Sequence, residues 1–191
     1  KEIRQLIFSR FLQITDGAEK LPFHKVAPIN RRPVEIDLET TYHEVGARSF
    51  GKGLFDKPSF QGKELTWQQP YWIHLEDLVF SNIKAWEGAV AAADDSAHLK
   101  VASHRYLTYE PDGEVTSAEF LCYYFLTPKG LEILGKASPG SADRNRTLNT
   151  RFLNNIMIPM PSPDGQREFL KFKNKMEQVQ KHHQSTLKEL D

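Results

Sequence analysis

The chain has 191 residues, a length that suits one globular domain with an accessory element or two small domains. Its 25 Lys and Arg residues balance its 25 Asp and Glu residues, so global charge gives no support to nucleic-acid binding and any basic surface must be local. The single cysteine and the lack of a long apolar stretch exclude a disulfide framework, a thiolate metal cluster and a membrane span, which predicts a cytoplasmic protein with no membrane partner.

A short amphipathic helix is predicted over residues 1–12, at the start of the chain. Ile3, Ile7 and Phe11 recur at helical spacing and give this helix one apolar face. We expect the face to pack against the body of the protein or against a second helix. Gly17 then ends the helical pattern.

The middle of the chain is predicted to be rich in strands. Residues 42–47 and 101–109 alternate polar and apolar side chains, and residues 71–80 indicate two strands around a turn at Glu76 and Asp77. These neighbouring carboxylates are expected to point apart and to face solvent.

Two helices are predicted after the strands. The first begins at a cap, Thr116 or Ser117, and ends at Thr127, and the second runs from Pro128 to about Lys136. Strands followed by helices predict an α+β fold, with a mixed, β-rich domain and then a long C-terminal helix.

Residues 48–53 form a predicted loop with two glycines, two cations, a hydroxyl and one aromatic ring. A flexible, basic loop of this composition can reach phosphates or base edges. In the alternative interpretation it is a solvated hairpin loop whose Phe50 folds back onto the core. Its candidate DNA-contacting residues are Arg48, Ser49, Phe50 and Lys52.

Further polar segments carry similar side chains. Residues 82–86 combine an amide, a cation and an indole, although Trp86 can equally belong to the core. The arginine-rich loop of residues 140–148 precedes the closing strand and can equally be a solvated loop. The candidates from these segments and their neighbours are Asn82, Lys84, Trp86, Arg105, Arg144, Asn145, Arg146 and Arg151.

A long helix is predicted over residues 161–191. Ser162 is a suitable N-cap, Pro163 is tolerated at the first helical position, and Asp164 faces the positive end of the helix dipole. Its apolar positions recur every three or four residues, as in a coiled coil, so the helix is expected to pair with another helix. The predicted helix-pairing residues are Phe169, Phe172, Met176, Val179, His183, Thr186 and Leu190.

The junction at residues 156–168 resembles the specificity subunits of type I restriction–modification enzymes. In that family a target-recognition domain closes with a short strand and a Pro-x-Pro step, and a conserved spacer helix begins with a proline and a glutamine. Pro159, Pro161, Pro163 and Gln166 match this pattern. The stretches 45–53 and 77–90 also look very like paired stretches in one branch of the family.

The resemblance implies a short N-terminal helix over residues 1–12, a target-recognition domain over 13–160 and a conserved spacer helix over 161–191. It implies double-stranded DNA and methyltransferase subunits as partners, with the restriction subunit as an indirect partner. Because no internal repeat is visible, the chain is expected to be half of such a subunit or a natural half-length version. A half-length chain is expected to pair with a second copy through its long helix and to present two recognition domains to a bipartite site.

No motif for catalysis or for a cofactor is recognisable in the sequence. The family resemblance likewise implies a non-catalytic subunit, because methylation and cleavage are carried out by separate chains. Two other functions remain open. The chain can be a protein–protein adaptor that acts through its long helix, or an enzyme whose titratable groups converge in a pocket between the polar loops.

Overall fold

The computed structural model describes residues 2–65, 68–140 and 146–190, with side chains as far as His183 and at Ser185. The chain forms two compact units. One consists of residues 1–21 and 158–191, and the other of residues 22–157.

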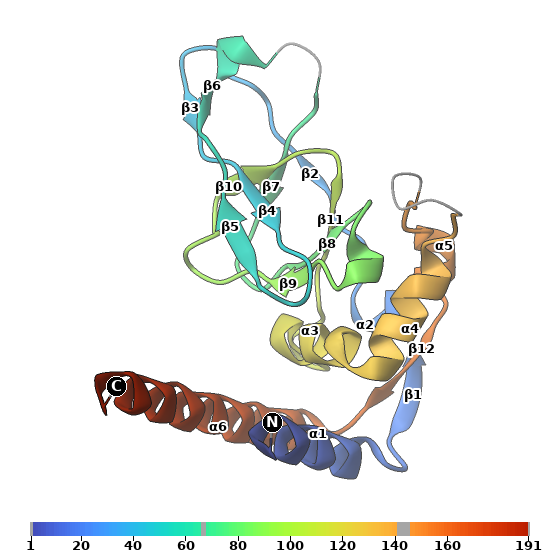
Figure 1. Ribbon diagram of the computed structural model, residues 1–191. Coiled ribbons are helices and arrows are strands. Elements are labelled where there is room, and N and C mark those ends of the chain that lie inside the picture. Colours follow the sequence, from blue (N-terminus) through green and yellow to red (C-terminus); the bar gives the residue numbers. More distant parts are fainter. Residues whose placement is uncertain (1, 66–67, 141–145, 191) are drawn as a thin grey trace. The chain divides into compact units, whose positions relative to one another are not determined.

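The first unit contains two helices, α1 (Glu2–Thr15) and α6 (Pro163–Leu190), and nearly all of a two-stranded sheet formed by β1 (Glu19–Pro22) and β12 (Met157–Met160). Helix α1 packs along α6 (Figure 1). The rings of Phe11 and Phe169 meet with their centroids 5.5 Å apart, and both side chains are buried. The apolar face predicted for the N-terminal helix therefore packs on the long helix.

Local capping explains where α6 begins. The Ser162 hydroxyl accepts a hydrogen bond from the Gly165 backbone N–H at 3.2 Å, and Pro163 occupies the first helical position. The predicted C-terminal helix is confirmed. Its pairing with another chain as a coiled coil stays a prediction.

The second unit is built from small antiparallel sheets. Two of them have three strands, in the orders β10-β7-β2 and β11-β8-β9, and the pairs β3-β6 and β4-β5 form two-stranded sheets. The strands are β2 (Arg32–Pro33), β3 (Thr41–Tyr42), β4 (Val45–Ala47), β5 (Leu54–Asp56), β6 (Phe60–Gln61), β7 (Tyr71–Ile73), β8 (Leu78–Ser81), β9 (Val90–Ala92), β10 (Lys100–Ala102) and β11 (Tyr106–Tyr109).

Helices cover one part of these sheets (Figure 1). Helix α3 (Ala118–Leu126) packs on β8 and β9, and α4 (Pro128–Ala137) packs on α3 and on a 3-10 turn, η2 (Ala85–Glu87). Among the described residues, the remaining short helices are α2 (Phe23–Val26), α5 (Thr150–Asn154) and the 3-10 turn η1 (Gly62–Glu64). The α+β fold predicted from the sequence is confirmed.

Hydroxyl caps set the ends of α3 and α4. Ser117 accepts from the Phe120 N–H at 3.2 Å, and Thr127 accepts from the Gly130 N–H at 3.1 Å. The sequence predicted these boundaries because capping depends on residues within one turn of each other. Beneath the helices, a cluster of aromatic rings fills the core, with Phe23 and Phe125 meeting edge to face at a centroid distance of 5.2 Å.

The expected single strand over residues 101–109 is two strands. The Tyr106 N–H donates to the Ser103 carbonyl at 3.0 Å, which closes a turn between β10 and β11. Strand β10 then pairs with β7, and β11 pairs with β8, so the two halves belong to different sheets. Alternation of side chains cannot reveal such a change of sheet, because both strands keep the same period.

None of the described helices is both long and apolar enough to cross a membrane.

Candidate nucleic-acid interface

The predicted basic loop is the tip of the β4–β5 hairpin. The Arg48 N–H donates to the Gly53 carbonyl at 3.0 Å and closes the loop. Three of its residues have a left-handed backbone conformation, with φ of 62° at Phe50, 63° at Gly51 and 77° at Gly53. Such a conformation is ordinary for glycine but uncommon for a bulky residue such as phenylalanine.

Hydrogen bonds from the 3-10 turn hold this tip in place. The Phe50 N–H donates to the Glu87 carbonyl at 2.8 Å, and the Gly51 N–H donates to the Gly88 carbonyl at 3.0 Å. Both turn carbonyls can face the hairpin because Gly88 ends η2 with φ of 76°. The loop and the turn, 38 residues apart in sequence at Ser49 and Glu87, therefore form one surface.

Side chains join the same two segments. The Glu87 carboxylate accepts from the Ser49 hydroxyl at 2.7 Å and from the Lys84 ammonium at 2.6 Å. The hydrogen bond from Lys84, followed by that from Ser49, lowers the pKa of the Glu87 carboxyl. The Ser49–Glu87 bond therefore joins the two segments, and Lys84 holds the Glu87 carboxylate within the turn. Glu87 is a residue of this surface that the sequence did not predict.

Trp86 brings a third segment to this surface. The Arg146 guanidinium lies 4.4 Å from the centroid of the indole ring, and the Lys84 ammonium lies 5.2 Å from it. The indole N–H donates to the Ile83 carbonyl at 3.2 Å, which fixes the ring plane. Trp86 is half-buried: part of its ring packs against the protein, and its ring also contacts the Arg146 guanidinium.

The backbone around Asn82 ties the remaining segments to the turn. The Asn82 N–H donates to the Arg105 carbonyl at 2.7 Å, and the Asn82 carbonyl accepts from the Leu148 N–H at 2.8 Å. We use the name tip–turn surface for residues 48–53, residues 82–88 and Arg146. Arg105 is exposed beside it, at the turn between β10 and β11.

Apart from Lys84, the described cations of the tip–turn surface lack acidic partners. Within the described part of the chain, Arg48, Lys52 and Arg146 make no ion pair. Arg48 instead lies 4.9 Å from the Phe55 ring centroid, and Lys52 lies 5.8 Å from that of Phe50. Because Lys84 neutralises Glu87, this surface carries a local positive charge although the whole chain is neutral.

The other predicted contact residues lie elsewhere. Arg105 also lines a pocket of about 370 Å³ in which Glu44 and Lys57 already form an ion pair at 2.5 Å. Arg151 is exposed on α5, and among the described residues no contact joins its side chain to the tip–turn surface. Arg144 and Asn145 lie outside the described residues. Where side chains are described, no three His, Cys, Asp or Glu residues are grouped as metal ligands would be.

The predicted helix-pairing residues differ in exposure along α6. Phe169 is fully buried within the first unit, where it packs against Phe11. Phe172 and Met176 are half-buried, whereas Val179 and His183 are exposed. The side chains of Thr186 and Leu190 lie outside the described part.

Replacing Gly88 with Ala is expected to lower the free energy of unfolding by about 1–3 kcal/mol, because a residue with a Cβ is strained at φ of 76°. The added Cβ would also lie 3.2 Å from the side chains of Leu126 and Leu131. Denaturant unfolding measures this loss. Gly113→Ala is the control, because a Cβ there meets no heavy atom within 4 Å. Equal stabilities of the two variants would contradict a structural role for Gly88.

Of the comparisons with known proteins, only the one with solved structures gives matches. No protein-family model matches the sequence, and no curated protein matches it. Among solved structures, the crystal structure of the HsdS subunit from Thermoanaerobacter tengcongensis matches with a TM-score of 0.67 and 18% sequence identity, over 90% of this chain and 45% of that chain. A chain from a structural study of complex assembly and conformational transition in the type I R-M system matches with a TM-score of 0.70 and 16% identity, over 88% of this chain and 44% of that one. The chain thus spans less than half the length of these two proteins, and it has the fold of a domain of HsdS specificity subunits.

Proposed function

We propose that this chain recognises a DNA sequence as the specificity subunit, or half-subunit, of a type I restriction–modification complex. The observation that carries the proposal is the tip–turn surface, where Arg48, Lys52 and Arg146 make no ion pair and lie on the same surface as the exposed Phe50 ring, on a fold shared with HsdS subunits. Duplex DNA offers phosphates for the cations and base edges for the planar groups.

The side chains divide by their chemistry. Arg48 and Lys52, at the exposed hairpin tip, are suited to hold phosphates, because a charge on a flexible stem positions the duplex without reading sequence. Arg146 is suited to read a base edge, because its guanidinium is already oriented by the Trp86 ring. A guanidinium can donate two parallel hydrogen bonds to O6 and N7 of guanine in the major groove.

The proposal extends to the rest of the complex. Residues 13–160 are the proposed target-recognition domain and residues 161–191 the proposed spacer helix. Methyltransferase subunits are the proposed direct partners and the restriction subunit an indirect one, acting on cytoplasmic DNA. Methylation and cleavage belong to those chains, and this chain only selects the sequence. Val179 and His183, exposed on α6, leave part of the predicted seam available for a second copy.

Replacing Lys52 with Ala is expected to weaken binding to all duplexes alike and to reduce the slope of log K against log salt by about 1, because one phosphate contact is lost. Titrations of DNA at several salt concentrations measure the slope. The control is Lys100→Ala, since the Lys100 ammonium is already paired with Asp56 at 2.6 Å. An unchanged slope for Lys52→Ala would remove Lys52 from the interface.

A further inference from the structure

Phe50 is displayed to solvent in a conformation that the surrounding structure enforces. The residue is 73% exposed, more than any other large hydrophobic residue in the described part of the chain. The alternative in which this ring folds back onto the core is therefore wrong. Its φ of 62° is unfavourable for a residue with a bulky side chain, and such strain persists only where neighbouring contacts hold it.

The contacts that hold Phe50 lie on its backbone and leave its ring free. Its own N–H and that of Gly51 are bonded to the carbonyls of Glu87 and Gly88. Beside it, Gly51 approaches Leu126 so closely that a Cβ at this glycine would lie 2.7 Å from the leucine Cδ1 atom. The loop is thus pressed onto the body of the second unit at residue 51, while the neighbouring ring points into solvent.

The residues around the Phe50 ring indicate what kind of partner it contacts. Lys52 lies 5.8 Å from the ring centroid, and Arg48 at the start of the same loop is also unpaired. A purely apolar pocket on another protein would leave these cations without partners, whereas DNA places the apolar faces of stacked bases behind a row of phosphates. A rigid aromatic side chain flanked by cations fits that combination.

We infer that Phe50 is a wedge that enters the base stack of the bound duplex and partly unstacks one base step. This inference rests on the proposed function and deepens it, because recognition then includes deformation of DNA as well as contact with base edges. Inserted apolar side chains are an established way for proteins to kink DNA. Pyrimidine–purine steps unstack most easily, so the wedge would favour such a step at its point of entry.

The test uses a duplex enriched by selection with the full chain and its methyltransferase partner, with 2-aminopurine placed at each position in turn. Stacking quenches this base, so unstacking raises its fluorescence. We expect a severalfold rise at one step with the unmodified chain, and loss of that rise with Phe50→Ala at protein concentrations that saturate the DNA. Phe50→Leu keeps an apolar wedge and should keep most of the rise. Lys52→Ala is the matched control, because it should weaken binding but leave the rise at saturation.

Each result separates the wedge from the proposed function. Sequence-selective binding without a rise at any position, or with the same rise in Phe50→Ala, would overturn the wedge and leave DNA recognition standing. Loss of methyltransferase association in Phe50→Ala, with DNA fluorescence unchanged, would show that the ring meets protein and would also overturn it. A chain that binds no duplex selectively would overturn the proposed function and the wedge together.

Discussion

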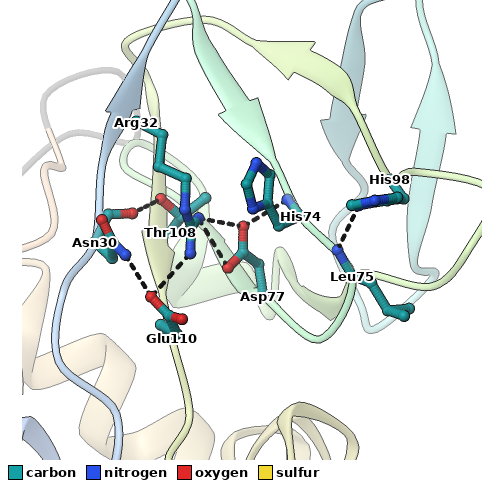
Figure 2. A network of polar contacts seen from close by, with 8 residues as sticks. All are labelled: Asn30, Arg32, His74, Leu75, Asp77, His98, Thr108 and Glu110. Carbon is teal, nitrogen blue, oxygen red and sulfur yellow. Dashed lines mark hydrogen bonds and ion pairs between the residues drawn. The ribbon is translucent and has the colours of Figure 1, made fainter.

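Replacing Arg32 with Ala is expected to lower the free energy of unfolding by about 3–5 kcal/mol, because it leaves a buried carboxylate without its cation. The side chain of Asp77 is only 1% exposed, and Nη1 of Arg32 donates to both carboxylate oxygens at 3.1 and 2.9 Å (Figure 2). Among the described residues, the other hydrogen bond to the Asp77 carboxylate comes from the His74 N–H at 2.8 Å. One amide donor does not replace a charged partner, so a large loss of stability is expected.

The same arginine joins two sheets. Arg32 begins β2, whereas Asp77 directly precedes β8 and Glu110 directly follows β11. Figure 2 shows the Arg32 guanidinium between the two carboxylates. Its Nη2 atom donates to the Glu110 carboxylate at 2.9 Å. Glu110 is half exposed, so Glu110→Ala should cost less than about 1 kcal/mol and is the control for the loss of a surface ion pair.

The loss of unfolding free energy caused by Arg32→Ala is expected to be smaller at acidic pH. Burial raises the pKa of the Asp77 carboxyl even with Arg32 present, and removal of the cation raises this pKa further. The folded variant then holds a proton that the unfolded chain releases above about 3.8, so stability falls as pH rises through this window. Urea unfolding of both proteins at pH 7 and pH 5 measures the difference. An equal loss at both pH values, or a loss no larger than that of Glu110→Ala, would contradict the buried-charge account.

Replacing Arg146 with Ala is expected to weaken binding to the preferred duplex by about 1–3 kcal/mol and to relax selectivity at one base pair. The structure orients this guanidinium on the Trp86 ring, at 4.4 Å from its centroid, so the cost of ordering a long side chain is already met in the free protein. The expected loss corresponds to about 5- to 150-fold in the dissociation constant.

Arg146→Lys separates charge from geometry in this experiment. Lysine keeps the charge but lacks the planar fork that binds a base edge with two hydrogen bonds. We expect Arg146→Lys to retain affinity for unrelated duplexes and to lose discrimination, as measured by competition between the preferred duplex and singly substituted ones. Full discrimination in Arg146→Lys would mean that Arg146 holds a phosphate.

Local signals in the sequence were sufficient for several elements. The caps at Ser162, Ser117 and Thr127 lie within one turn of the amides that they bond, so the helix starts could be predicted. The basic hairpin tip could also be predicted, because turn residues and cations are adjacent in sequence. The candidate residues of loops 48–53 and 82–86 indeed share one surface with Arg146.

Contacts between distant residues could not be predicted from one sequence. Nothing in the sequence indicates that Glu87 binds Ser49, because neither residue is unusual in its own segment. The expectation that Glu76 and Asp77 face solvent is wrong for Asp77, which is buried against Arg32 from 45 residues earlier. An ion pair of this kind depends on how the sheets come together.

The most direct test of sequence-specific recognition is selection from a randomised duplex pool, with the methyltransferase partner present and at moderate salt. Sequencing of the retained DNA is expected to return one short half-site of defined bases, either once or in a spaced pair. Enrichment at one base pair of this half-site should be lost with Arg146→Ala, and the whole half-site should be kept with Lys100→Ala. A pool that stays flat with the unmodified chain would contradict DNA recognition, and the adaptor function of the long helix would then be the better account.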